Sequence, residues 1–155
     1  MNFKRYQFLR ATAIEKLKGT IEHEGNTTAN AEDSLMLAYI GDAVYSLFVR
    51  ERMTEAGIMK VQVLHNLVTD FICAKAQAKV LQAWDTEQVL TDVEQQVAKR
   101  ARNSQVHVPK SATVQEYRAS TAFEAVLGYL YRTNQTERLQ TLMGQAFQYT
   151  LNSMK

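Results

Sequence analysis

Cysteine and proline are almost absent from this chain of 155 residues, which holds one of each and only six glycines. A single cysteine, Cys73, excludes an internal disulfide framework and is consistent with a reducing cytoplasm, where we expect the protein to be located. The scarcity of turn-forming residues favours helices. No apolar run reaches the length that spans a membrane, so we expect no membrane partner.

Hydrophobic residues make up 46% of the chain and charged residues 22%, which is typical of a globular protein and excludes a disordered one. Apolar residues recur at steps of three and four in several segments, while no segment shows the alternation of a strand. The sequence therefore predicts an all-α protein. A first amphipathic helix is expected to carry the apolar residues from Phe3 to Leu17 and to stop in the segment Glu24–Asn30. The other expected helices are a central helix capped by Asp33 or Ser34 and ending near Gly57, one or two helices over Lys60–Trp84, a helix from the Thr91/Glu94 capping box to about Arg102, one starting near Thr113, and one capped by Thr136. Polar loops are expected at Glu24–Asn30 and Asn103–Ala112.

The central helix contains an apolar run, LMLAYIGDAVYSLFV (Leu35–Val49), interrupted by Gly41 and Asp42. A helix that is apolar nearly all round is expected to be buried, where a carboxylate is costly unless it is paired, hydrogen-bonded or bound to a metal. Asp42 is thus either a buried residue held by backbone groups or a metal ligand.

A second run, STAFEAVLGYLY (Ser120–Tyr131), places Glu124 in an apolar helix with Gly128 four residues later. Glycine inside a helix costs about 1 kcal/mol relative to alanine, so these glycines suggest that two helices approach closely. The approach would bring Glu124 and Asp42 together. Two such carboxylates repel each other, and a divalent cation such as Mg²⁺, which prefers oxygen ligands, removes that repulsion.

These two runs, in this order, resemble the signature segments of the ribonuclease III catalytic domain. LHNLVTDFICAKAQAKVL (Leu64–Leu81) and ARNSQVHVPKSATVQEYRASTAFEA (Ala101–Ala125) resemble more closely its Mini-ribonuclease III branch, the short bacterial form that lacks a double-stranded-RNA-binding domain. The resemblance begins near Ser34. We therefore expect residues 1–31 to be an N-terminal helix and loop extension and residues 32–155 to be a ribonuclease III-like catalytic domain.

The resemblance implies that Asp42 and Glu124 are the metal-binding catalytic carboxylates of an Mg²⁺-dependent endoribonuclease, with Mn²⁺ as an alternative metal. The longer enzymes of the family have two further carboxylates, at the places that Ala38 and Thr121 occupy here. The number of metal ions is therefore left open, as is a contribution from the hydroxyl groups of Ser120 and Thr121. The implied substrate is double-stranded RNA, specifically the precursor of large-subunit (23S) ribosomal RNA.

The family also implies a homodimer in which the signature helices pack across a twofold axis. Tyr39, Val44 and Phe48 are expected either at that interface or in the core of the subunit. Basic residues indicate where RNA would bind, because residues 95–115 contain no acidic side chain, and the rest of the chain holds 14 basic and 16 acidic residues. The candidate phosphate contacts are Lys99, Arg100, Arg102, Lys110 and, close to Glu124, Arg118.

Two other functions fit the sequence. One is a non-catalytic RNA-binding or assembly module that keeps the fold, an alternative raised by Ala38 and Thr121. The other is a helical protein–protein interaction domain, against which the basic segment counts.

Overall fold

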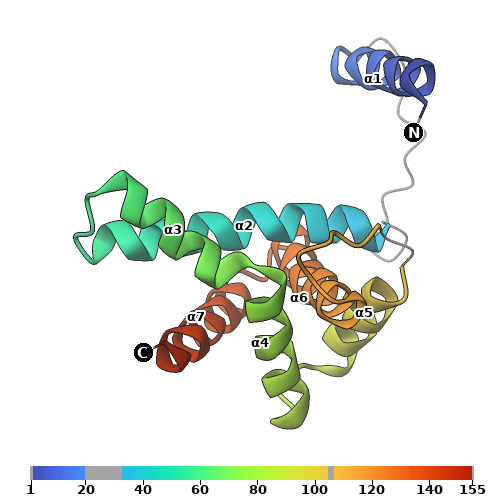
Figure 1. Ribbon diagram of the computed structural model, residues 1–155. Helices are drawn as coiled ribbons and strands as arrows, with labels where there is room; N and C mark the ends of the chain where they lie inside the picture. The colour runs from blue at the N-terminus through green and yellow to red at the C-terminus, as the bar shows by residue number, and fades with distance from the viewer. Residues whose placement is uncertain (1, 20–32, 105–106, 155) are drawn as a thin grey trace. The chain divides into compact units, whose positions relative to one another are not determined.

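The computed structural model describes residues 2–19, 33–104 and 107–154, and every element in these ranges is a helix. The chain divides into two compact units, Met1–Ala31 and Glu32–Lys155. The first unit contains α1 (Phe3–Leu17), and the second contains α2 to α7 (Figure 1). The prediction of an all-α protein is confirmed, while the expected loop at Glu24–Asn30 lies outside the described residues.

The ends of α1 and α2 follow from local chemistry. Asn2 caps α1 by accepting a 3.0 Å hydrogen bond from the backbone N–H of Lys4. Asp33 caps α2 (Ser34–Glu55) in the same way, through the N–H of Leu35 at 3.0 Å. The chain leaves α2 at Gly57, whose φ of +80° lies in the left-handed region that favours glycine. Both predicted boundaries of the central helix are confirmed.

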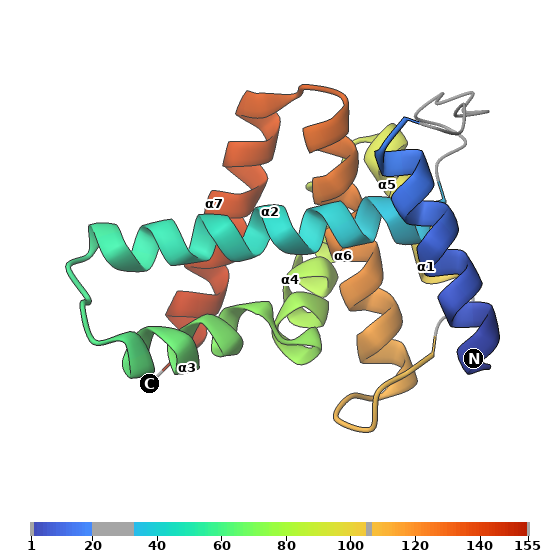
Figure 2. The ribbon, with the colours of Figure 1, turned by 90° about the horizontal axis from the view of Figure 1, so that it is seen from above.

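The segment Lys60–Trp84 forms two helices, α3 (Val61–Ile72) and α4 (Ala74–Thr86). The break falls at Cys73, which has extended backbone angles (φ −66°, ψ 153°) and whose N–H donates to the carbonyl of Thr69. Of the two forms that the sequence left open, the pair of helices is the one that occurs. The break lets α4 turn away from α3 toward α6 (Figure 2).

The remaining helices are α5 (Asp92–Arg102), α6 (Val114–Arg132) and α7 (Thr136–Ser153). The capping box at the start of α5 is present: Glu94 N–H donates to Thr91 Oγ1 (3.2 Å), and Thr91 N–H donates to the Glu94 carboxylate (2.8 Å). Thr113 caps α6. The prediction that Thr136 caps α7 is wrong, because Thr136 is the first helical residue and Gln135 stands at the cap without a side-chain hydrogen bond.

The core is built around α6, whose second half is buried on nearly every side. Phe123 is fully buried and lies edge-on to Tyr45 of α2 (ring centroids 5.0 Å apart) and stacked on Trp84 of α4 (5.3 Å). Burial of such rings contributes hydrophobic stabilisation together with specific ring packing. The aromatic contacts fix α2 and α4 against the same helix that carries Glu124.

A buried ion pair joins α5 to α7. The side chain of Glu94 is 2% exposed, and Arg138 donates to it through Nε and Nη2, both at 2.9 Å. Arg138 also donates to the carbonyl of Val89 at 2.7 Å. Glu94 therefore serves both as part of the α5 cap and as the partner of an arginine 44 residues away. No helix among the described residues is long and apolar enough to cross a membrane.

Candidate active site

The site lies where α2 crosses α6, and two glycines allow the crossing. A Cβ atom on Gly41 would overlap the backbone carbonyl of Glu124, and one on Gly128 would overlap the carbonyl of Leu37. The two backbones thus touch directly, and these helices make the most extensive contact in the fold (Figure 2). The close approach that the sequence predicted is confirmed. Asp42 follows Gly41 directly, while Glu124 precedes Gly128 by one turn, so the crossing brings both carboxylates to one place.

The two carboxylates differ in exposure. Both were expected to be buried, but Glu124 is half-buried and Asp42 is exposed. The expectation that Asp42 is buried is wrong, because α3 to α7 leave one stripe of α2 uncovered in the described part of the second unit. Met36, Tyr39 and Leu47 of that stripe are 54%, 74% and 57% exposed.

Both carboxyl groups have raised pKa values. Loss of hydration raises the pKa of Asp42 above its ordinary value, even though the residue reaches solvent. Burial and, secondly, the negative charge of Asp42 raise the pKa of Glu124 to about 8, while the nearby polar side chains of Ser120 and Gln77 lower it in part. Because the charge of Asp42 acts on Glu124, the two groups are electrostatic neighbours. The pair therefore favours binding of a proton or of another cation.

Polar groups surround Glu124 on its α4 side. Ser120 Oγ lies 2.6 Å from Gln77 Oε1 and 3.3 Å from Glu124 Oε1. Gln77 comes from α4 and is only 1% exposed. Thr121, by contrast, donates its hydroxyl hydrogen to the carbonyl of Tyr117 (3.0 Å). Of the two hydroxyl groups considered from the sequence, that of Ser120 is therefore the one beside the carboxylates.

The residues present fit a divalent cation. Asp42 and Glu124 supply hard oxygen ligands, their mutual repulsion is relieved by positive charge, and the exposure of Asp42 leaves space for water and a phosphate. Mg²⁺ is commonly held by one or two carboxylates and keeps several waters. The described residues contain no group of three or more His, Cys, Asp or Glu side chains that could hold a metal. Any ion here would be completed by solvent or substrate rather than by a closed protein cage.

The five candidate RNA contacts do not form one cluster. Arg102 and Arg118 line the same cleft, between α4, α5 and α6, whereas Lys99 lines a neighbouring hollow. Arg100 and Lys110 are exposed outside both linings. Arg102 is half-buried and pairs with Asp85 of α4, with Nη2 3.2 Å from Oδ2, so part of its charge is neutralised within the protein.

Two further basic residues, Lys75 and Lys79 of α4, line the cleft of Arg102 and Arg118. Neither lysine is among the RNA contacts predicted from the sequence. Their spacing of four residues places them on one helix face, which was the available signal, but only the packing of α4 on α6 puts that face beside Arg118. The lining contains four basic residues and two acidic ones, Asp85 and Glu116, and is therefore positive.

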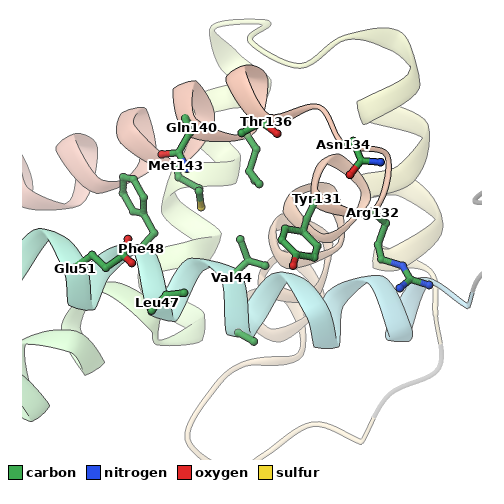
Figure 3. Close-up of a pocket in the computed structure, with 12 residues that line it drawn as sticks. Val44, Leu47, Phe48, Glu51, Tyr131, Arg132, Asn134, Thr136, Gln140 and Met143 are labelled. Carbon is green, nitrogen blue, oxygen red and sulfur yellow. The ribbon is translucent and has the colours of Figure 1, made fainter.

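A second hollow, of about 650 Å³, lies between α2, the end of α6 and the start of α7. Figure 3 shows Val44 and Phe48 of α2 facing Tyr131 of α6 and Met143 of α7 across it. Phe48 also packs in the subunit's core, where it is 6% exposed, and Val44 is half-buried against that core. Tyr39 is exposed on the uncovered stripe of α2. Of the three residues considered for an interface, Tyr39 is thus outside the core, whereas Val44 and Phe48 belong to it and also line the hollow.

Comparison with known proteins gives a consistent result. Residues 35–135 match the Ribonuclease III domain family. A protein named Mini-ribonuclease 3 from Streptococcus pneumoniae is 42% identical over 120 residues, covering 77% of this chain and 94% of the relative. One of the same name from Symbiobacterium thermophilum is 47% identical over 113 residues, covering 72% and 85%. A crystal structure of a Fusobacterium nucleatum protein, 28% identical, superposes with a TM-score of 0.70 over 76% of this chain and 96% of that one.

Proposed function

Because the chain belongs to the ribonuclease III family, in its Mini-ribonuclease III branch, and is therefore an endoribonuclease, we propose that it hydrolyses phosphodiesters of double-stranded RNA at a metal site formed by Asp42 and Glu124. The observation that carries this proposal is the close crossing of α2 and α6 at Gly41 and Gly128, which makes Asp42 and Glu124 neighbours. The proposed metal is Mg²⁺, with Mn²⁺ as an alternative.

The two residues have different tasks in this proposal. Asp42, which is exposed, faces the substrate and water, while Glu124, which is half-buried, anchors the site from the core side. When bound, a divalent cation supplies a Lewis acid that polarises the phosphoryl group and lowers the pKa of the attacking water. Glu124 must be ionised to serve as a ligand. Its raised pKa means that metal binding has to displace a proton at neutral pH.

The α4/α5/α6 cleft, lined by Lys75, Lys79, Arg102 and Arg118, is the proposed contact for RNA phosphates. Its α4 and α6 walls belong to the helices that hold Gln77 and Ser120, so the cleft and the carboxylates share one scaffold. A-form RNA is recognised mostly by shape and by contacts to phosphates and 2′-hydroxyls, which a rigid basic cleft supplies. Lys99, Arg100 and Lys110 extend this basic surface in the proposal.

The protein is proposed to act as a homodimer that cuts both strands. The apolar stripe of α2 (Met36, Tyr39 and Leu47) and the hollow beside Phe48 are what a second copy would cover. In light scattering coupled to size-exclusion chromatography, Leu47→Lys should shift the protein to a monomer. The matched control is Met59→Lys, at an apolar residue that is 88% exposed and lies between α2 and α3. A dimer unaffected by Leu47→Lys would contradict this interface.

The proposed cellular role is maturation of the large-subunit (23S) ribosomal RNA precursor in the cytoplasm. The support is the resemblance of the two signature segments to the Mini-ribonuclease III branch. Its test is incubation of the purified protein with a transcript containing the paired ends of that precursor. Cleavage confined to the paired ends is expected, and cleavage no better than that of an unrelated duplex would contradict the role.

The mechanism is tested with a long labelled RNA duplex, in Mg²⁺ or in EDTA. Metal-dependent cutting of both strands is expected, and Asp42→Asn and Glu124→Gln should abolish it while leaving duplex binding largely intact. Glu137→Gln, at an exposed glutamate of α7, is the control for the loss of one carboxylate. Normal cutting by both site variants would refute the assignment of these carboxylates.

A non-catalytic RNA module is the second candidate. It is favoured by one observation, namely that Ala38 and Thr121 leave only two carboxylates at the site and no larger cluster among the described residues. Salt-dependent duplex binding without any cutting in Mg²⁺ or Mn²⁺ would support it.

A further inference from the structure

Gln77 is an unusual residue for the interior of this fold. It is 1% exposed, in the first turn of α4, on the face that also buries Val80, Leu81 and Trp84. Its Oε1 accepts a short hydrogen bond from Ser120 Oγ (2.6 Å). Its Nε2, which is equally buried, has no hydrogen-bond partner among the described residues. A buried amide that leaves a donor unmet is costly, so such a group in a native core calls for a functional reason.

The unmet donor belongs to a side chain that acts on Glu124. The Gln77 amide is close enough to influence the Glu124 carboxyl, and Ser120, which holds the other end of the amide, lies one turn before Glu124 on α6. Ser120 has a single hydroxyl hydrogen, and the shorter of its two contacts directs that hydrogen to Gln77. The serine therefore fixes the amide so that its oxygen is occupied and its nitrogen is available.

We propose that Gln77 is a positioning residue for Glu124, and that its Nε2 is kept as a donor for the carboxylate oxygen that does not bind the metal. This inference rests on the proposed function, because it assumes that Glu124 is a metal ligand. Carboxylates that bind metals are usually hydrogen-bonded in turn, which sets their orientation. With only two carboxylates at the site, the orientation of each one matters more than in a site with a fuller ligand set.

The arrangement of helices explains why this residue comes from α4. Helix α6 packs against both α2 and α4 (Figure 2). It carries Glu124, while α2 carries Asp42 and α4 carries Gln77. Asp42 and Gln77 thus approach the same carboxyl group from different helices. A purely structural role would be to satisfy the hydroxyl of Ser120, and that role predicts an effect on folding but none on metal affinity.

The experiment measures binding of Mn²⁺ to the full-length protein without RNA, by following free Mn²⁺ with electron paramagnetic resonance. Gln77→Met keeps the length of the side chain and removes its hydrogen bonds, and Ser120→Ala removes the hydroxyl that holds the amide. Gln145→Met, at an exposed glutamine of α7, is the matched control. Circular dichroism melts of the metal-free proteins establish that each variant is folded.

Gln77→Met should weaken Mn²⁺ binding about tenfold to a hundredfold, as loss of such supporting groups typically does. Ser120→Ala should cause a smaller loss in the same direction, and Gln145→Met none. The double variant should lose less than the sum of the single variants, because both act through one carboxylate. In duplex cleavage, the Mn²⁺ concentration for half-maximal rate should rise for Gln77→Met, while saturating Mn²⁺ should restore most of the rate.

Wild-type Mn²⁺ affinity in folded Gln77→Met would overturn the proposal. If Gln77→Met does not fold, Ser120→Ala decides, and wild-type affinity in that variant would overturn the proposal equally. The proposed function fails in a different way, through absence of Mn²⁺ binding by the wild-type protein or through undiminished binding by Glu124→Gln.

Discussion

Replacing Glu124 with glutamine should stabilise the metal-free protein above pH 5, although it should abolish cleavage. In the folded chain the pKa of Glu124 is about 8, whereas the ordinary value is 4.5. Between these two pH values the folded protein holds a proton that the unfolded chain has released. The free energy of unfolding therefore falls as the pH rises through this window, and it is independent of this group above it. Glutamine stays neutral, so the free energy of unfolding of the variant lacks this decrease with pH.

The size of the effect follows from the width of the window. One pKa unit corresponds to about 1.4 kcal/mol, so the wild-type protein should lose up to about 4 kcal/mol between pH 5 and pH 8 relative to Glu124→Gln. For a protein of this length, each kcal/mol shifts the melting temperature by about 2–4 °C. The gap between the two melting temperatures should thus widen to roughly 10 °C by pH 8.

The assay is thermal unfolding in EDTA from pH 5 to pH 9, with wild-type, Glu124→Gln and the exposed control Glu137→Gln side by side. The wild-type and control curves should fall together, while that of Glu124→Gln stays above them. Adding Mg²⁺ at pH 8 should raise the melting temperature of the wild-type protein and leave that of Glu124→Gln unchanged. Parallel curves for wild-type and Glu124→Gln from pH 5 to pH 8 would refute the reasoning.

Three other experiments test separate parts of the structure. Gly128→Ala should force α2 and α6 apart, with a loss of about 1–3 kcal/mol in the free energy of unfolding measured in urea and with loss of cleavage. Its control is Gly144→Ala, where a Cβ meets nothing within 4 Å and the change should be neutral or stabilising. Equal stability of the two variants would contradict the role of Gly128 in the helix crossing. Arg138→Met should cost about 3–5 kcal/mol by leaving Glu94 buried and unpaired. Burial by itself raises the pKa of Glu94, but Arg138 and Thr91 outweigh it and lower that pKa below its ordinary value. The stabilisation by this carboxylate should therefore be lost as the pH falls through the lowered pKa. An acid unfolding transition that is identical in Arg138→Met would count against this role of Arg138. Replacing Lys75 and Lys79 together with glutamine should weaken duplex binding and reduce its salt dependence by about two ions, as measured by fluorescence anisotropy. An unchanged salt slope would exclude the α4/α5/α6 cleft as a site of RNA phosphate contacts.

Much of the local structure was determined by the sequence alone, because helix caps are short-range chemistry. The Thr91/Glu94 box, Asp33 and Thr113 each place a hydrogen-bonding side chain next to the backbone N–H groups that it caps. The cap of α7 was misplaced by one residue, since Thr136 is a suitable residue type but the chain enters the helix at Gln135. The apposition of Asp42 and Glu124 could also be predicted, because glycine inside an apolar helix has few explanations other than close approach.

Tertiary structure decided the burial and the partners of the site residues, because these depend on which helix faces pack against each other. Periodicity showed that α2 is apolar, but only the placement of α3 to α7 within the same unit left one stripe of α2 uncovered and Asp42 exposed. Gln77 stands in an alanine-rich segment that gives no sign of burial, and its link to Ser120 spans 43 residues. Likewise, part of the positive charge of Arg102 is neutralised by an ion pair with Asp85, a residue of another helix. The sequence determined which groups can do chemistry, and packing decided how much water, charge and hydrogen bonding each of them receives.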